Sequence, residues 1–133
     1  KTEKGDEMRS ILIIIVTLGL ILGVGYFTIS EVSGTSEVLL SRCDGIKTGV
    51  RDGEWEKALE HLKRFDNFWN GVKPLWAILI DHTEIDNIDM ALAKIEQYIK
   101  TGEKGLALGE LSSLELLIRH IPDKEKVSLE NIF

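Results

Sequence analysis

The chain has 133 residues, enough for one domain plus one membrane span, and a single cysteine, Cys43, which excludes an internal disulfide framework. Its formal net charge is −6, and residues 30–133 carry 13 basic against 19 acidic side chains. An acidic surface argues against nucleic acid as a partner, because cations must neutralise the phosphates, and against docking on anionic lipid head groups.

An uncharged apolar segment occupies residues 11–29, which read ILIIIVTLGLILGVGYFTI. As a helix it would be about 28 Å long, close to the hydrocarbon thickness of a bilayer. We therefore predict a transmembrane signal anchor. Two other interpretations stay open. A cleaved signal peptide is disfavoured by the length of the run and by the lack of an A-x-A-like cleavage site, and a buried core helix is disfavoured by the lack of an amphipathic face.

The flanking charges predict the orientation of this anchor. Lys4 and Arg9 precede it, Glu31 and Glu37 follow it, and Arg42 is the first basic residue beyond it. Since Lys and Arg are in excess on the cytoplasmic side of membrane proteins, residues 1–10 are expected to form a cytoplasmic tail. The rest of the chain would then lie outside the cell membrane.

Two glycines inside the segment, Gly19 and Gly23, form a G-x-x-x-G pair. This spacing lets two transmembrane helices approach closely, although such pairs also occur by chance. The pair makes a homodimer contact in the membrane a hypothesis.

After the anchor, Ser33-Gly34-Thr35-Ser36 is expected to break the helix, so residues 30–35 are predicted to be a linker and residues 36–133 an extracytoplasmic helical bundle. Thr35 or Ser36 would cap the first bundle helix. That helix would present a modest apolar stripe and end at the Asp52-Gly53 turn. The stripe is Val38, Leu39, Ile46 and Val50.

The second bundle helix is expected to begin at Glu54 and to end or kink near Gly71 and Pro74, because proline lacks a backbone donor. Apolar residues recur along it at steps of three or four residues, which indicates an amphipathic helix. They are Trp55, Leu59, Leu62, Phe65, Trp69 and Val72.

The third helix is expected to begin near Thr83, with Asp86 in a capping-box arrangement, and to end at Gly102. Its stripe is Ile85, Ile88, Leu92, Ile95 and Ile99. The fourth helix would run from about residue 103 to residue 121, where Pro122 would stop or kink it, and the tail would form a short helix docked on the bundle. The fourth stripe is Leu108, Leu111, Leu114, Leu117 or Ile118, and Ile121; the tail keeps Val127, Leu129, Ile132 and Phe133.

A sequence pattern that occurs twice in the chain, referred to below as the echo, supports an architecture of helical hairpins. The pattern G-E-x-x-x-A-L-x-x-L-x-x-apolar begins at Gly53 and again 49 residues later at Gly102. It resembles the helix starts of tetratricopeptide-type hairpins, but the spacing does not fit that family's 34-residue period. We expect two helices that begin alike and present similar faces to one core. With no strand alternation in the sequence, the prediction is an all-α fold: an N-terminal transmembrane helix and an antiparallel bundle of about four helices.

Three stretches of the chain resemble a family of short clostridial proteins, the domain of unknown function 4363. They are MRSILIIIVTLGLILGVGYFTIS, WEKALEHL and the long stretch from ILIDHTEIDNIDM to SLENI, in which residues 79–88 and His120-Ile121-Pro122 are the most specific. The resemblance implies an N-terminal membrane segment and a helical domain in Gram-positive anaerobes. It implies no known activity and no catalytic residues.

The sequence concentrates potential ligands in one acidic patch: Asp81, His82, Glu84, Asp86 and Asp89. Three interpretations stay open. The carboxylates satisfy free amides at a helix N-terminus, they bind a partner, or they hold a divalent cation, although the spacing does not match the calcium-loop pattern.

Other chemistry-bearing residues lack a motif. The histidines His61, His82 and His120 form no metal pattern, Cys43 has no C-x-x-C partner, and no phosphate loop or nucleophile motif occurs. We therefore predict no cofactor and no enzyme activity. Trp76 is expected in the core, with the alternative that it and residues 78–80 form a binding surface or lie at the membrane interface.

These observations predict a single-pass membrane protein that acts as an interaction or scaffold protein through another membrane or envelope protein. The alternative is an extracytoplasmic domain that binds or senses a ligand and signals through a partner. The third hypothesis is a metal-dependent enzyme that uses the Asp81–Asp89 cluster.

Overall fold

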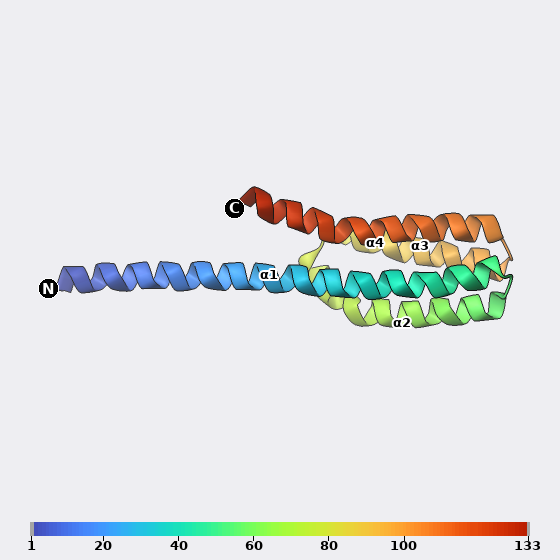
Figure 1. The fold of residues 1–133 in the computed structure, drawn as a ribbon, viewed down its shortest axis with the longest axis horizontal. Coiled ribbons are helices and arrows are strands. Elements are labelled where there is room, and N and C mark those ends of the chain that lie inside the picture. The colour runs from blue at the N-terminus through green and yellow to red at the C-terminus, as the bar shows by residue number, and fades with distance from the viewer. Residues whose placement is uncertain (1, 133) are drawn as a thin grey trace.

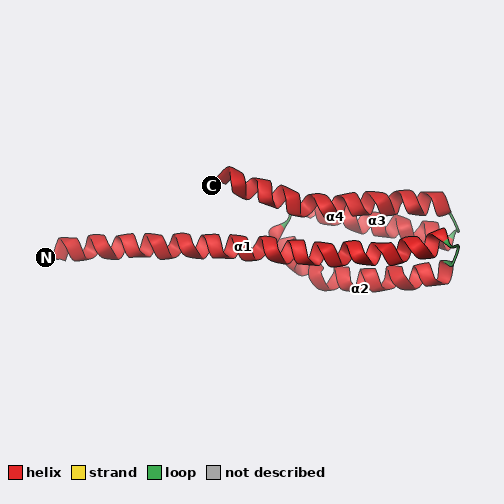
Figure 2. Cartoon of the chain, viewed as in Figure 1, coloured by secondary structure: helices red, strands yellow, loops and turns green. Residues whose placement is uncertain are grey.

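The computed structural model describes the backbone of residues 2–132 and the side chains of residues 3–123. Its elements are α1 (Thr2–Arg51), α2 (Trp55–Leu79), α3 (His82–Lys100) and α4 (Lys104–Ile132), joined by short turns (Figures 1 and 2). Residues 2–132 contain no strand. The prediction of an all-α fold with a bundle of about four helices is confirmed.

The four helices pack as a ring in which successive helices are antiparallel (Figure 1). α1 contacts α2 and α4, and α3 contacts the same two helices from the other side. Only the C-terminal half of α1 takes part, while its N-terminal half extends away from the bundle as a single straight helix (Figure 1). Turns of two to three residues favour this arrangement, because they connect only antiparallel neighbours.

The core is built from one seam of buried residues on each helix. In α1 these positions are spaced alternately by four and three residues, the pattern of coiled-coil-like packing. They are Val32, Ser36, Leu39, Cys43, Ile46 and Val50. The stripe predicted for α3 is confirmed at all five positions. In α4 the seam runs through Ala107 and Ile118, while Leu108 and Leu117 are only partly buried at its edge.

The two turns at the far end of the bundle have the same conformation. Gly53 and Gly102 both adopt positive φ, 68° and 69°, which favours glycine. Each lies in a Schellman motif: the amide of Glu54 donates to the Gly49 carbonyl at 2.9 Å, and that of Glu103 donates to the Tyr98 carbonyl at 2.8 Å. The helix starts that follow bury equivalent residues, which confirms the echo. The pairs are Ala58 with Ala107, Leu62 with Leu111, and Phe65 with Leu114.

The break expected at residues 33–36 is wrong, and so is the linker at 30–35. α1 runs through this stretch without interruption, and Thr35 does not cap a helix. Its hydroxyl instead donates to the Glu31 carbonyl within the helix at 2.9 Å. The cost of a mid-helix glycine, about 1 kcal/mol, is outweighed by the burial of the seam that starts at Val32.

Neither predicted proline boundary ends a helix. α2 continues through Pro74 to Leu79, and α4 continues through Pro122 to Ile132. A proline at position 122 leaves the Ile118 carbonyl without its helical donor, and the buried Ser36 hydroxyl donates to that carbonyl at 3.0 Å. The tail is therefore part of α4, and the predicted docking of Val127 and Leu129 lies outside the described side chains.

Candidate functional site

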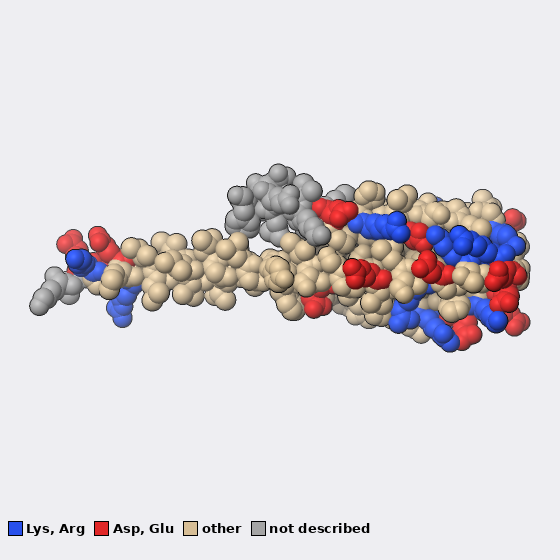
Figure 3. Space-filling model, viewed as in Figure 1, with Lys and Arg blue, Asp and Glu red and all other residues tan. Residues whose placement is uncertain are grey.

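The N-terminal half of α1 exposes apolar side chains all round. It is the one helix among the described residues that is long and apolar enough to cross a membrane, judged by length and composition, and none of its most apolar stretch is buried. Figure 3 shows it as an uncharged rod between the terminal charges and the bundle. The exposed large side chains are Met8, Ile11, Leu12, Ile13, Ile14, Ile15, Val16, Leu18, Leu20, Ile21, Leu22, Val24, Tyr26 and Phe27. Each would gain about 1.5–3 kcal/mol in an apolar environment.

The apolar run meets the bundle within one helical turn. The run ends at Ile29, and Val32, three residues or about 4.5 Å further along the helix, is already completely buried. The turn between α2 and α3 lies at this same end of the bundle (Figure 1). The bundle is thus fixed to the apolar rod by a continuous helix rather than by a linker.

A polar and aromatic network ties three helices together near this junction. Trp76 Nε1 donates to Thr35 Oγ1 at 2.9 Å, which joins α2 to α1. Trp76 packs edge-to-face on Trp69 with ring centroids 5.3 Å apart, and Trp69 Nε1 donates to Asp89 Oδ1 of α3 at 2.8 Å. Lys73 Nζ lies 2.5 Å from the other Asp89 oxygen. Asp89 is therefore held by one indole and one ammonium group.

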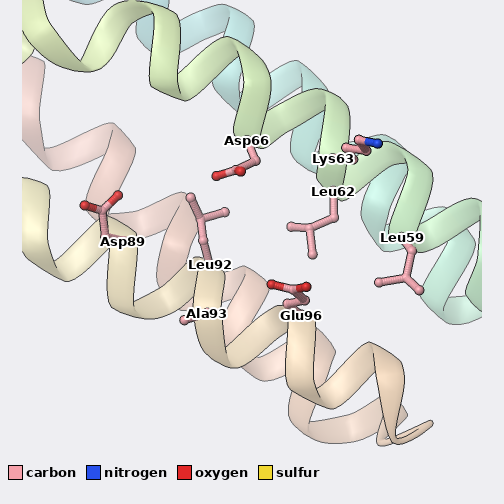
Figure 4. Close-up of a pocket in the computed structure, with 8 residues that line it drawn as sticks. All are labelled: Leu59, Leu62, Lys63, Asp66, Asp89, Leu92, Ala93 and Glu96. Atoms are coloured by element: carbon pink, nitrogen blue, oxygen red, sulfur yellow. The ribbon is translucent and has the colours of Figure 1, made fainter.

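Next to Asp89 a groove of about 510 Å³ separates α2 from α3 (Figure 4). Its apolar floor consists of Leu59, Leu62 and Leu92, with Ala93 as its smallest wall residue. Its polar rim consists of Asp66, Asp89, Glu96 and Lys63. In Figure 4 the Asp66 and Asp89 carboxylates lie on opposite walls, one on each helix.

The rim is acidic, and its carboxylates differ in how far they are neutralised. Asp89 pairs with Lys73, and Glu96 pairs with Lys100 at 2.7 Å. Asp66 accepts from the Asn70 amide at 3.4 Å, and within the described side chains it forms no ion pair. Asp66 is therefore the groove carboxylate with the least compensated charge.

A family model described as a domain of unknown function matches residues 26–132. The chain belongs to this family, DUF4363. The match covers the whole bundle and the last residues of the apolar run, which confirms the resemblance; residues 11–25 lie outside it. Comparison with curated proteins finds no match, and comparison with solved structures finds none.

In this DUF4363 chain the predicted acidic patch is divided between different roles. Asp81 caps α3, because its carboxylate accepts from the Thr83 amide at 3.0 Å, whereas Asp89 belongs to the tryptophan network. His82 and Asp86 are exposed, and Glu84 is half-buried on the first turns of α3. Among the described residues no three His, Cys, Asp or Glu side chains are grouped to hold a metal ion. The partner-binding role of the patch stays a prediction.

The glycine pair and the cysteine have different surroundings. Gly19 and Gly23 lie on the exposed half of α1, with open space where a Cβ would be, and their helix contact stays a prediction. Cys43 is completely buried in the bundle seam. Burial, assisted by the negative charge of Glu115, raises the pKa of its thiol from 9.0 to about 12, and Lys47 opposes this rise.

The groove was missed by sequence reasoning. Leu59 and Leu62 belong to the predicted apolar stripe of the second bundle helix, and no motif includes Asp66 or Ala93. Their relation depends on two helices lying side by side, so no local pattern reveals it. The nearest signal is the stripe Asp86-Asp89-Ala93-Glu96, which recurs at three- and four-residue steps beside the α3 core stripe.

Proposed function

We propose that the chain is a single-pass membrane protein whose bundle binds a segment of another membrane or envelope protein. One observation carries the proposal: α1 is a single helix whose two halves differ in how they expose apolar side chains. Its bundle half closes a core without help from residues 11–27, and those residues stay exposed all round. A helix that is apolar on every side suits lipid as its surroundings.

The charges at the two ends of the apolar run support an orientation. Lys4 and Arg9 lie before it, and the first basic residue after it is Arg42, inside the bundle half of α1. The excess of Lys and Arg near the N-terminal end favours a cytoplasmic N-terminus and a bundle outside the membrane.

The groove between α2 and α3 supports a partner of definite chemistry. Its apolar floor suits the apolar face of an amphipathic segment, in the manner of helix-in-groove recognition. Its rim carries three carboxylates and one lysine, and Asp66 forms no ion pair within the described side chains. The partner segment would therefore carry basic residues beside its apolar ones.

Thiol labelling in intact cells tests the anchor and its direction. Ser113 is exposed on α4 and Ser10 is exposed before the apolar run, so each is replaced singly by cysteine. A membrane-impermeant maleimide should label Ser113→Cys in intact cells and Ser10→Cys only after permeabilisation. The opposite pattern would reverse the orientation, and a shortened, released bundle would show that the segment is a cleaved signal peptide.

Co-purification from detergent-solubilised membranes tests the groove. Ala93→Trp fills it from an exposed position, whereas Ser113→Trp adds the same ring on α4, away from the groove. A stoichiometric partner should be retained by the native chain and by Ser113→Trp but lost from Ala93→Trp. Equal retention by all three would remove the groove from the proposal.

A charge reversal tests the predicted basic character of the partner. Asp66→Lys changes the rim, and Asp44→Lys makes the same charge change at an exposed position of α1. We expect Asp66→Lys alone to weaken retention at low salt, because it repels a basic segment. If both variants weaken retention equally, the effect belongs to net charge and not to the groove.

A second candidate function is the binding of a small ligand. The groove volume, about 510 Å³, lies within the range typical of small-molecule sites. The same purification separates the two candidates, because mass spectrometry of the native chain detects either a second protein or a retained small molecule. Loss of that molecule in Ala93→Trp would favour the ligand-binding function.

A further inference from the structure

We propose that the edge of α2 formed by Leu75 and Ile78 inserts into the interface of the bilayer that holds α1. The inference rests on the proposed anchoring of α1. It adds a second membrane contact, made by the bundle itself, which fixes the tilt of the bundle against the membrane.

The hydrogen bond between Trp76 and Thr35 sets the height of this edge. Because α1 and α2 are antiparallel and these two residues touch at 2.9 Å, Ile78 lies level with about residue 33 of α1. This level is about four residues, or 6 Å, beyond the end of the apolar run at Ile29. The polar interface extends about 5–7 Å beyond the hydrocarbon on each side of a bilayer, so Ile78 lies within that zone.

The exposure of the edge has no explanation within the bundle. Ile78 is 81% exposed and Leu75 is 37% exposed, although Trp76 between them is completely buried. Ile78 is thus more exposed than any other large apolar residue described. The junction with α1 is continuous helix, so the edge cannot be displaced from the membrane surface by a flexible linker.

The charges beside the edge decide which part of the bilayer it meets. Asp81 and Asp86 follow on the turn and on the start of α3, and Glu84 lies between them. These carboxylates disfavour anionic head groups, so electrostatic docking is not the attraction. The edge therefore meets the interfacial zone of the bilayer, which takes up apolar side chains of helices that lie against it.

Quenching by lipid-attached doxyl groups tests the contact on the full chain in phosphatidylcholine vesicles. Three variants each carry one new cysteine that is labelled with a fluorophore. They are Ile78→Cys at the edge, Ile21→Cys in the apolar run, and Leu106→Cys at the far end of the bundle. All three positions are exposed, so the label should not disturb the core. Cys43 is buried and is kept in all three variants. The native chain, treated with the same fluorophore, gives the background from labelling of Cys43.

We expect a shallow doxyl group to quench the label at residue 78 at least threefold more than the label at residue 106. A deep doxyl group should quench the label at residue 21 best. If residue 21 is quenched but residues 78 and 106 are alike, the inference is overturned and the anchor stands. If residue 21 is not quenched, the anchor itself fails and the inference fails with it.

Discussion

The two halves of α1 form one continuous helix, but the N-terminal half exposes its apolar side chains and the C-terminal half buries them in the bundle. From Met8 to Phe27 the large apolar side chains are exposed on every side. From Val32 to Val50 the apolar side chains follow a narrow seam, and charged residues such as Arg42 and Lys47 lie outside it. The change takes place within about one turn of helix.

This difference shows how the pattern of apolar residues distinguishes a helix that packs against other helices from one that is apolar on every side. A seam at alternating four- and three-residue steps needs partner helices, and α2 and α4 supply them. An apolar surface without a seam needs a surrounding apolar phase. Because no linker separates the halves, the bundle is held at a fixed height relative to the apolar run.

Charges in the apolar half should have the largest effect. Ile15→Arg with Ile21→Arg places two guanidinium groups in the run, at about 2.5–3.5 kcal/mol each for membrane insertion. We expect the chain to be lost from carbonate-washed membranes. Val38→Arg with Ser41→Arg adds the same charges at exposed positions of the bundle half and should leave the chain in the membrane. Retention of the first pair would break the assignment of this half to lipid.

Thiol reactivity should separate the two halves of α1 by more than about tenfold, because the lower thiolate fraction of Cys43 outweighs the greater nucleophilicity of a more basic thiolate. With the Cys43 pKa raised to about 12, the thiolate fraction at pH 8 is about a thousandfold below that of a free cysteine. In detergent, Cys43 should therefore react with a disulfide reagent far more slowly than Ser10→Cys in a Cys43→Ala background. Concentrated urea should abolish the difference. Rapid labelling of native Cys43 would show that the bundle half opens.

The same thiol contributes to the pH dependence of stability. The folded state keeps its proton up to about pH 12, whereas the unfolded chain releases it near 9.0. Unfolding is therefore favoured as the pH rises through this window, and the contribution of Cys43 to stability, complete below pH 9, is lost across it. Cys43→Ala should give a smaller alkaline loss of stability in urea unfolding than the native chain.

Much of the fold could be predicted because each bundle helix carries its own periodicity. The α3 stripe is confirmed residue by residue, and the repeated pattern at Gly53 and Gly102 correctly predicts two helices that begin alike and bury equivalent residues. The continuity of α1 could not be predicted, because Ser36 and Cys43 occupy seam positions that a search for large apolar residues passes over. Gly34 and Pro74 favour helix breaks locally, but tertiary packing overrides both, and α1 and α2 continue through them.

The candidate site was less predictable than the fold. A run of acidic residues such as Asp81 to Asp89 is visible in sequence, but its division between a helix cap and a tryptophan network depends on three-dimensional contacts. The groove depends on how far apart α2 and α3 lie over Leu62 and Leu92. The distance between two helices depends on the volumes of many side chains that pack between them, so no local sequence pattern predicts it.

The smallest expected effect concerns Ser36, which marks the start of the bundle half. Ser36→Ala leaves the Ile118 carbonyl without a donor, because Pro122 has none to give, and this should cost about 1–3 kcal/mol in urea unfolding. Ser41→Ala, at an exposed position on the same helix, should change stability by less than about 0.5 kcal/mol.

A double-mutant cycle with Pro122→Ala identifies the cause of this cost. Alanine at position 122 restores a backbone N–H that can donate to the Ile118 carbonyl within α4, so the Ser36 hydroxyl is no longer needed. We expect Ser36→Ala to cost at least about 0.5 kcal/mol less in the Pro122→Ala background. An equal cost in both backgrounds would mean that Ser36 acts through packing alone. The seam of the bundle half would then be held by side-chain volume, without the polar link that joins its first turn to α4.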